Sequence, residues 1–141
     1  MKGLILTFFT VMSLTFMGQA QGLTLQDGLY TDENGALYSG EVTLFHENGE
    51  MKTNFFVEDG MIQHVALFYD INGRLIMSGS YTENTKDGLW LSYDGKGKVS
   101  SKAEYRRGKK IGEWVIKSPY SDLTYNLYYA NNELLSAFVA E

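Results

Sequence analysis

"KKIGEWVIK", residues 109–117, places a glycine two residues before a tryptophan in a segment that otherwise has the composition of a β-strand. The same glycine and tryptophan occur 24 residues earlier in "KDGLWLSYD", residues 86–94. Glycine weakens a strand because it has no side chain to pack. Gly112 and Trp114 point to the same side of a strand, so the bare glycine backbone is predicted to leave room for a ring from a neighbouring strand.

The spacing of 24 residues recurs along most of the chain. Each period contains an aromatic residue, then a glycine or asparagine, and then the glycine–tryptophan pair or its replacements. A fixed period of this length is typical of stacked supersecondary units that cannot bury an apolar face alone. The structural positions of the repeat are Gly40, Tyr81, Gly88, Trp90, Tyr105, Gly112 and Trp114, and the tryptophan position is occupied by Val42, Ala66 and Phe138 in the other units.

Each repeat is predicted to be a β-hairpin. Residues 74–82 and 98–106 alternate between two kinds of side chain with the period of two that is typical of a strand. Asn34-Gly35, Asn48-Gly49 and Asn72-Gly73 are predicted to be type I′ turns, in which both residues have positive φ. We therefore expect an all-β protein, an elongated antiparallel meander of tandem hairpins with about nine or ten short strands.

Residues 1–20 have the features of a secretory signal peptide. Lys2 supplies a positive charge, residues 4–17 are uncharged and mostly apolar, and Gly18-Gln19-Ala20 has the small-x-small pattern of a cleavage site. A membrane anchor is the alternative, but an apolar run of about 14 residues is shorter than the ~20 that span a bilayer. We predict cleavage after Ala20 and a periplasmic or secreted protein.

The remaining residues, 21–141, are predicted to form a single domain, with clear repeats at 38–117 and a degenerate terminal unit at 118–141. The chain contains no cysteine, which excludes disulfides and thiolate chemistry. Residues 21–60 carry eight acidic residues and one basic residue, whereas 96–117 carries eight basic and two acidic residues. This asymmetry indicates either an anionic partner at the basic end or a solvated surface whose ends attract each other or a neighbouring molecule.

The repeat resembles the MORN family, specifically its bacterial variant, whose pattern is roughly aromatic–x–x–Gly–Lys–x–x–Gly–x–Trp. "YRRGKKIGEW" (105–114) and "YTENTKDGLWLSYDGKGKV" (81–99) match it closely, and "YSGEVTLFHENGEM" (38–51) is a fair match. The resemblance implies an elongated, twisted antiparallel sheet. Many bacterial relatives are labelled antitoxin components of toxin–antitoxin systems, and eukaryotic relatives act as scaffolds or associate with membrane lipids. The resemblance brings no catalytic motif with it.

The sequence offers no convincing catalytic, metal or cofactor site. Its two histidines are His46 and His64, and His64 occupies a glycine position of the repeat, which favours drift in a degenerate unit over metal ligation. "YDGKGK" (93–98) resembles a phosphate-binding loop, but a strand pattern follows it where a helix is required. We therefore expect a protein that is not an enzyme and needs no cofactor. Turn chemistry is predicted to explain most of the acidic residues, including Asp32, Glu33, Glu47, Asp70 and Asp94.

The side of the predicted sheet opposite Trp90 is also apolar in the middle of the chain. A large exposed apolar patch usually marks an interaction surface. The alternatives are that the sheet curls or that the ends of the chain fold over the patch, through Leu23, Leu25 and Leu29 or through Leu134, Leu135, Phe138 and Val139. The residues of the patch are Val65, Leu67, Tyr69, Ile76, Leu89, Leu91 and Tyr93.

These observations favour an exported interaction or scaffold module that binds an unidentified protein through an aromatic or apolar sheet face. A second hypothesis is peripheral binding to an anionic membrane surface or glycan, which the overall acidity of the chain disfavours. A third, which follows from the resemblance, is an antitoxin-like component. We expect no nucleic-acid partner. The residues of the second hypothesis are Lys96, Lys98, Lys102, Arg106, Lys109 and Lys110.

Overall fold

The structure is a computed structural model that describes residues 22–140. The predicted signal peptide, residues 1–20, lies outside the described residues. The described part of the chain contains eleven β-strands and no helix. The strands are β1 (Thr24–Gln26), β2 (Leu29–Thr31), β3 (Gly40–Phe45), β4 (Met51–Glu58), β5 (Met61–Tyr69), β6 (Leu75–Thr82), β7 (Thr85–Tyr93), β8 (Val99–Arg106), β9 (Lys109–Lys117), β10 (Thr124–Ala130) and β11 (Glu133–Ala140).

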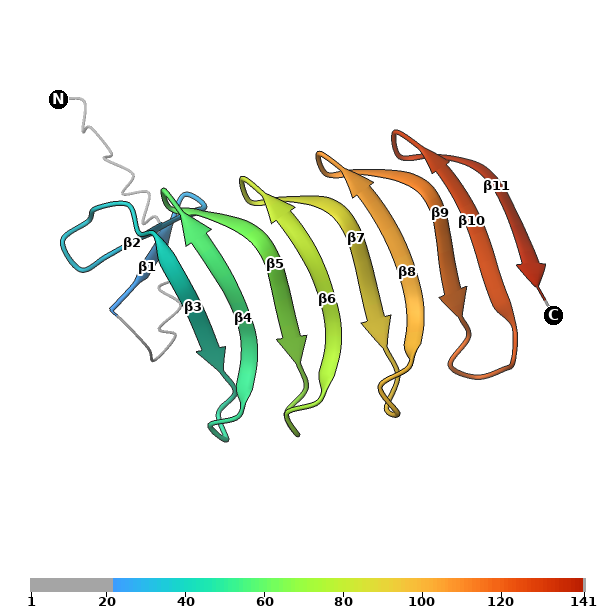
Figure 1. The fold of residues 1–141 in the computed structure, drawn as a ribbon, viewed down its shortest axis with the longest axis horizontal. Helices are drawn as coiled ribbons and strands as arrows, with labels where there is room; N and C mark the ends of the chain where they lie inside the picture. Colours follow the sequence, from blue (N-terminus) through green and yellow to red (C-terminus); the bar gives the residue numbers. More distant parts are fainter. Residues whose placement is uncertain (1–21, 141) are drawn as a thin grey trace, which may run out of the picture.

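Strands β3 to β11 form one antiparallel sheet in which every strand pairs with its neighbours in the sequence. Figure 1 shows the result, an elongated and twisted sheet with β3 at one edge and β11 at the other. β1 and β2 form a separate two-stranded sheet, and Thr31 of β2 also forms an isolated bridge with Leu37. The predicted all-β meander of tandem hairpins is therefore confirmed. The number of strands exceeds the prediction because the N-terminal segment forms a hairpin of its own.

Two kinds of turn alternate along the meander. At one end of the strands, two successive residues have positive φ, as at Glu83 (50°) and Asn84 (63°) or Asn131 (49°) and Asn132 (75°). These φ values are the ones that a two-residue type I′ hairpin turn requires. The type I′ turns predicted at Asn34-Gly35, Asn48-Gly49 and Asn72-Gly73 are wrong, since only the glycine of each pair has positive φ.

The turns at the other end are longer, and two of them, between β5 and β6 and between β7 and β8, are organised by an aspartate. Asp94 Oδ1 accepts hydrogen bonds from the backbone N–H groups of Lys96 (2.8 Å) and Lys98 (2.9 Å). Asp70 makes the same pair of bonds one repeat earlier, and Asp32 makes an equivalent pair. The predicted turn role of these three aspartates is confirmed. The bonds favour the charged carboxylate, and the backbone bond from Lys98 is the main reason that the pKa of Asp94 lies below its ordinary value.

The repeated glycine before the tryptophan lies in a β-bulge. Gly79 pairs with Trp90 and Tyr81 with Lys86, so one residue of β6 lies opposite three residues of β7. Gly88, within those three, has a φ of 93°. The pairings of β4 with β5 and of β8 with β9 show the same one-against-three arrangement.

The glycine position therefore requires a left-handed backbone, which glycine adopts most readily. Gly112 has a φ of 63° and His64 a φ of 64°. The prediction that a ring lies over the backbone of Gly112 is wrong, because a Cβ atom there would meet the side chain of Glu104 and no ring. His64 retains the conformation of the repeat although its residue type has changed.

The glycine whose bare backbone lies under a ring is a different one, Gly79, which pairs directly with Trp90. A Cβ atom at Gly79 would overlap the indole of Trp90. The indole N–H of Trp90 donates to the backbone carbonyl of Ser80 at 3.1 Å. The indole N–H of Trp114 donates to the backbone carbonyl of Glu104, also at 3.1 Å. Both indoles thus occupy equivalent positions on the same face of the sheet.

This face, which we call the ladder face, carries a continuous series of rings. Tyr105 lies between the two indoles, with ring centroids 6.3 Å from Trp90 and 5.1 Å from Trp114. Tyr129 continues the series at 5.1 Å from Trp114. Contacts of this kind between rings add about 0.5–1.5 kcal/mol each to the energy of apolar burial. Each hairpin is therefore held to the next by shared rings.

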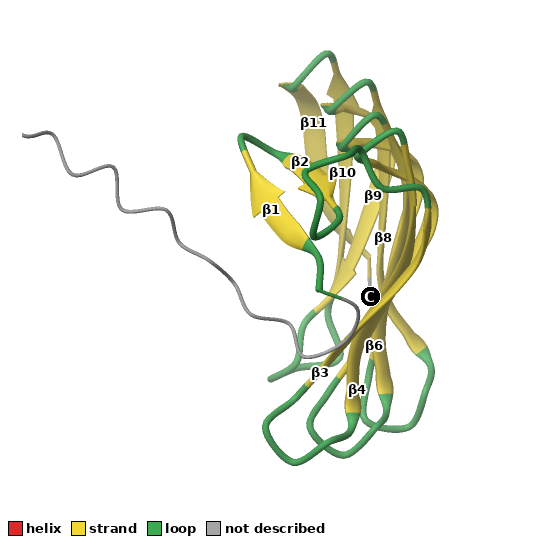
Figure 2. Cartoon of the chain, turned by 90° about the vertical axis from the view of Figure 1, so that its left-hand side faces the viewer, coloured by secondary structure: helices red, strands yellow, loops and turns green. Residues whose placement is uncertain are grey.

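The hairpin of β1 and β2, which we call the N-terminal hairpin, covers the ladder face at the β3 end. Figure 2 shows it lying against one side of the sheet. The ring of Tyr30 lies 5.5 Å from that of Phe55, and Leu23 and Tyr30 pack against the buried cluster. The N-terminal segment therefore does not cover the opposite face, which is one of the alternatives that the sequence allows. The buried cluster consists of Val42, Phe55, Val57 and Ala66.

The last hairpin departs from the repeat. Leu127 pairs with Ala137, where the 24-residue spacing would pair it with Phe138. Phe138 consequently points to the opposite face, where its ring stacks on Tyr128 with a centroid distance of 5.9 Å. The placement of Phe138 in the tryptophan position is therefore wrong. In the earlier bulges the longer strand has two extra residues, whereas between β10 and β11 it has one extra residue, Leu135. This difference of one residue shifts the alternation of side chains, so that Phe138 changes face.

Candidate functional site

The predicted apolar patch is assembled on the face opposite the ladder face, which we call the outer face. Leu67 pairs with Ser78, and Ser78 pairs with Leu91, so these three side chains form one row across β5, β6 and β7. Partners in a sheet share a face, and alternate residues of a strand return to it. The alternation places the seven predicted residues together on this face.

The outer face is apolar and accessible at this point. The exposed fractions are 55% for Val65, 44% for Leu89 and 41% for Ile76. Phe56 on β4 is also exposed and extends the patch, with its ring centroid 5.8 Å from that of His64. Phe56 was not predicted as part of the patch, although its alternation with the buried Phe55 and Val57 is the signal that could have identified it.

The patch has two apolar ridges with a polar trough between them. β5 and β7 contribute large side chains, whereas β6 contributes Ser78 and Ser80 between them and the apolar Ile76 at one end. The hydroxyl of Ser78 lies 3.1 Å from that of Tyr93, which fixes the tyrosine ring at the edge of the trough. A protein strand or helix could therefore lay apolar side chains between the ridges and still find hydroxyl groups as hydrogen-bond partners.

The C-terminal strand does not cover this patch. β11 is at the far edge of the sheet from β5, with β6 to β10 between them. Since the N-terminal hairpin lies on the ladder face, neither end of the described chain covers the outer face of β5 to β7. Among residues 22–140, nothing shields the patch from solvent or from a partner.

The six basic residues of the second hypothesis are not brought together. Lys96 and Lys98 belong to the turn between β7 and β8, whereas Arg106 and Lys109 flank the turn at the opposite end of β8. Lys102 lies on the outer face between them, where it pairs with Leu91. Lys110 lies on the ladder face, so the set is divided between both faces and both ends of the strands.

Two lysines lie over the rings of the ladder face. The Nζ atom of Lys110 lies 4.9 Å from the ring centroid of Trp114 and 5.0 Å from that of Tyr129. Lys86 occupies the equivalent position one repeat earlier, 3.9 Å from the Trp90 ring. These are cation–π contacts. Burial lowers the pKa of the Lys86 ammonium below its ordinary value, because a desolvated cation is less stable.

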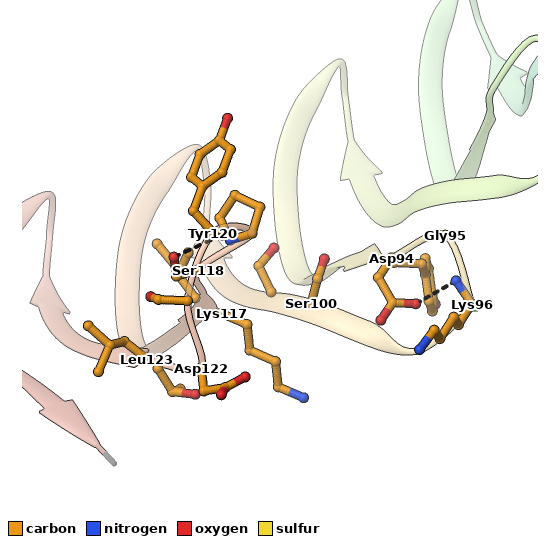
Figure 3. A pocket seen from close by; sticks show the side chains of 15 residues that line it. Asp94, Gly95, Lys96, Ser100, Lys117, Ser118, Tyr120, Asp122 and Leu123 are labelled. Atoms are coloured by element: carbon orange, nitrogen blue, oxygen red, sulfur yellow. Dashed lines mark hydrogen bonds between the residues drawn. The ribbon is translucent and has the colours of Figure 1, made fainter.

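A wide hollow lies between the β7–β8 turn and the loop of residues 118–123. Figure 3 shows its side chains spread along the turn and the loop, without convergence on one point. Ser100 and Lys117 are among the lining residues, and no described histidine joins them as a general base. Tyr120, which also lines the hollow, is 96% exposed. Among the described residues that line the hollow, no hydrogen bond joins a serine hydroxyl to a basic or acidic side chain.

The histidines have structural contacts. His46 Nε2 lies 3.0 Å from the carbonyl oxygen of Tyr69, and His64 lies in a bulge beside Phe56. In the part of the chain that the structure describes, no group of histidine and carboxylate side chains could hold a metal ion. The described residues also contain no helix that is long and apolar enough to cross a membrane.

A comparison with known protein families found no family model that matches the chain, and a comparison with curated proteins found no match.

Proposed function

We propose that this chain is an exported, non-enzymatic β-repeat protein of the MORN-variant type that binds another protein through the outer face of β5 to β7. The observation that supports this proposal best is the exposed apolar patch on that face, which the described residues leave uncovered. Val65 and Leu89 are each more than two-fifths exposed, although they lie in the middle of a sheet. Contiguous apolar surface of this kind is typical of protein interaction sites.

The two-ridge form of the patch supports a protein partner over a small molecule. A small-molecule site is concave and buries most of its ligand, whereas this patch is a broad surface across three strands. The serine hydroxyls between the ridges supply the few polar contacts that a partner's backbone or side chains need. The proposed role is therefore recognition or scaffolding.

Site-specific photo-crosslinking tests the proposal. We replace Leu89 by a benzophenone amino acid and, as the control, Asn126, which lies on the outer face two strands beyond β8. The protein is irradiated with an extract of the cell envelope. The proposal predicts discrete adducts from position 89 that are absent from position 126 and are lost when Leu91→Asp is added.

Adducts that are the same from both positions, or that persist in the Leu91→Asp variant, would contradict the proposal. Asn126→Asp provides the matched charge control, since it adds the same charge outside the patch. Urea unfolding midpoints of both variants establish that they are folded before the adducts are compared.

A further inference from the structure

The N-terminal hairpin is attached to the sheet by two hydrogen bonds as well as by packing. The backbone N–H of Tyr30 donates to the carbonyl of Gly60 at 2.8 Å. The side-chain amide Nδ2 of Asn84 donates to the carbonyl of Gly28 at 2.7 Å. Asn84 is itself held in place, because its Oδ1 accepts the backbone N–H of Ile62 at 2.6 Å. Asn84 is therefore an oriented donor for a hairpin that lies on the ladder face.

The same donor is present two repeats later. Asn132 stands 48 residues after Asn84, and its Oδ1 accepts the backbone N–H of Lys110 at 2.7 Å. Its φ of 75° is close to the 63° of Asn84. The Nδ2 group of Asn132 donates to no residue between 22 and 140. The fold thus repeats the anchor of the N-terminal hairpin at a place where no described hairpin uses it.

The ladder face of β9 to β11 is open. At the end of the strands away from Asn132, the row formed by Ile116, Tyr125 and Val139 crosses β9, β10 and β11 on this face, and all three side chains are exposed. Leu134, which pairs with Tyr129, is 50% exposed. The corresponding part of the ladder face near β3 is buried under Leu23 and Tyr30 of the N-terminal hairpin.

The charges of this open area favour an acidic occupant. Strands β6 to β11 place Lys86 and Lys110 on the ladder face, whereas their carboxylates, such as Glu104 and Glu113, lie on the outer face. Neither lysine has a described carboxylate as an ion-pair partner. The segment 22–38, which includes the N-terminal hairpin, contains three acidic residues and no basic residue.

We propose that the ladder face of β8 to β11 is a second hairpin site, which binds an acidic β-hairpin of a partner protein. The hairpin places leucine or tyrosine side chains on Tyr105, Trp114 and Tyr129. A backbone carbonyl of its turn accepts the Nδ2 hydrogen bond of Asn132, and a carboxylate lies near Lys110. This site is separate from the patch on the outer face and does not depend on it.

A backbone-cyclised synthetic peptide of residues 22–38 is a suitable probe, because it has the chemistry of the hairpin that the fold already accepts. It is titrated into the whole folded protein, and binding is followed by the NMR signals of the Asn132 side-chain amide and the Trp114 indole N–H. The proposal predicts saturable shifts of both signals. A peptide in which Asp27, Asp32 and Glu33 are replaced by lysine is expected not to bind.

Asn132→Asp is the decisive variant, because it keeps the acceptor for the Lys110 backbone N–H while it replaces the Nδ2 donor by a charged carboxylate oxygen, which repels an acidic peptide. Loss of the hydrogen bond, together with repulsion between the new carboxylate and the acidic peptide, is expected to weaken peptide binding at least about fivefold. Lys110→Glu is expected to weaken it further. Lys102→Glu, with the same change of charge on the outer face, is expected to leave the affinity unchanged.

Three results would overturn the proposal. The first is the absence of saturable shifts at Asn132 and Trp114, and the second is equal affinity for the wild type and Asn132→Asp. The third is a shift of these signals when the protein alone is concentrated, which would identify the occupant as the hairpin of a second copy and not of a separate partner. Urea unfolding midpoints of the variants establish that a loss of affinity does not arise from unfolding.

Discussion

Gly79 is the residue on which the largest side chain of the core depends. The indole of Trp90 lies over its backbone, and the indole N–H donates to the carbonyl of the next residue, Ser80. The backbone of Gly79 has no unusual φ, so the requirement for glycine is one of space alone. A methyl group at this position has to displace a ring that is only 5% exposed.

We therefore expect Gly79→Ala to lower the free energy of unfolding by about 3 kcal/mol, the upper part of the range for overpacking. Gly95→Ala is the control, because a Cβ there meets nothing closer than a guanidinium nitrogen of Arg74 at 4.0 Å. It is expected to change stability by less than about 0.5 kcal/mol. Urea unfolding curves measure both values. Equal effects of the two substitutions would show that Trp90 does not need the bare backbone.

At the scale of single residues, the sequence predicted the right interaction and assigned it to the wrong glycine. A ring over bare backbone is present, but the glycine is Gly79 on the neighbouring strand and not Gly88 or Gly112. The cross-strand partner of a tryptophan depends on register, and the register here depends on bulges that a single sequence does not reveal. The left-handed backbone of His64 was not predicted either, because it also depends on the position of a bulge.

At the scale of the turn and its two strands, the aspartate loops make the stability of the sheet depend on pH. Hydrogen bonds from backbone N–H groups lower the pKa of Asp70 and Asp94, with the bonds from Arg74 and Lys98 as the largest causes. A carboxyl group whose pKa is lowered on folding stabilises the folded state above its unfolded pKa, which is about 3.9. This contribution is lost as the pH falls through the folded pKa.

Asp94→Asn removes the charge and keeps the shape of the side chain. We expect the variant to be less stable than the wild type at neutral pH, and the difference to shrink as the pH is lowered from about 5 to about 2. Urea unfolding midpoints over this pH range test the expectation. A difference that stays constant with pH would show that the charge of Asp94 has no role in the turn.

The composition of the turns explains which of them were predicted. Asp32, Asp70 and Asp94 were recognisable because aspartate and glycine mark turns in any sequence. The type I′ turns were assigned to Asn-Gly pairs, the strongest local signal for them, but they occur at sites such as Arg107-Gly108 and Glu83-Asn84. Arginine and glutamate do not by themselves indicate positive φ. The pairing of the two flanking strands therefore imposes the positive φ of Glu83 and Arg107.

At the scale of the whole molecule, the sheet has two faces with different roles. The ladder face joins the hairpins through shared rings and is covered at one end by the N-terminal hairpin. The outer face carries an apolar patch that the described chain leaves open. The sequence predicted the patch, because alternation along a strand fixes which residues share a face.

The open end of the ladder face near β11 was not predicted. Its residues, such as Tyr125 and Leu134, have the pattern of a buried face, and only the tertiary structure shows that the covering hairpin lies at the other end. The position of Phe138 was missed because the last bulge differs from the others by one residue. These features depend on contacts between distant segments, which the repeat pattern does not contain.

The most direct test of the account is the accessibility of neighbouring residues on the two faces. The chain contains no cysteine, so each introduced thiol is unique. Val65 and Ala66 are adjacent on β5, but their exposed fractions are 55% and 1%.

Single-cysteine variants at these positions are treated with a thiol reagent under native conditions, after urea unfolding has shown that both are folded. We expect Val65→Cys to be labelled at least about a hundredfold faster than Ala66→Cys, since a buried thiol reacts only when the structure opens locally. Comparable rates at the two positions, or faster labelling of Ala66→Cys, would contradict the assignment of one packed face and one open face.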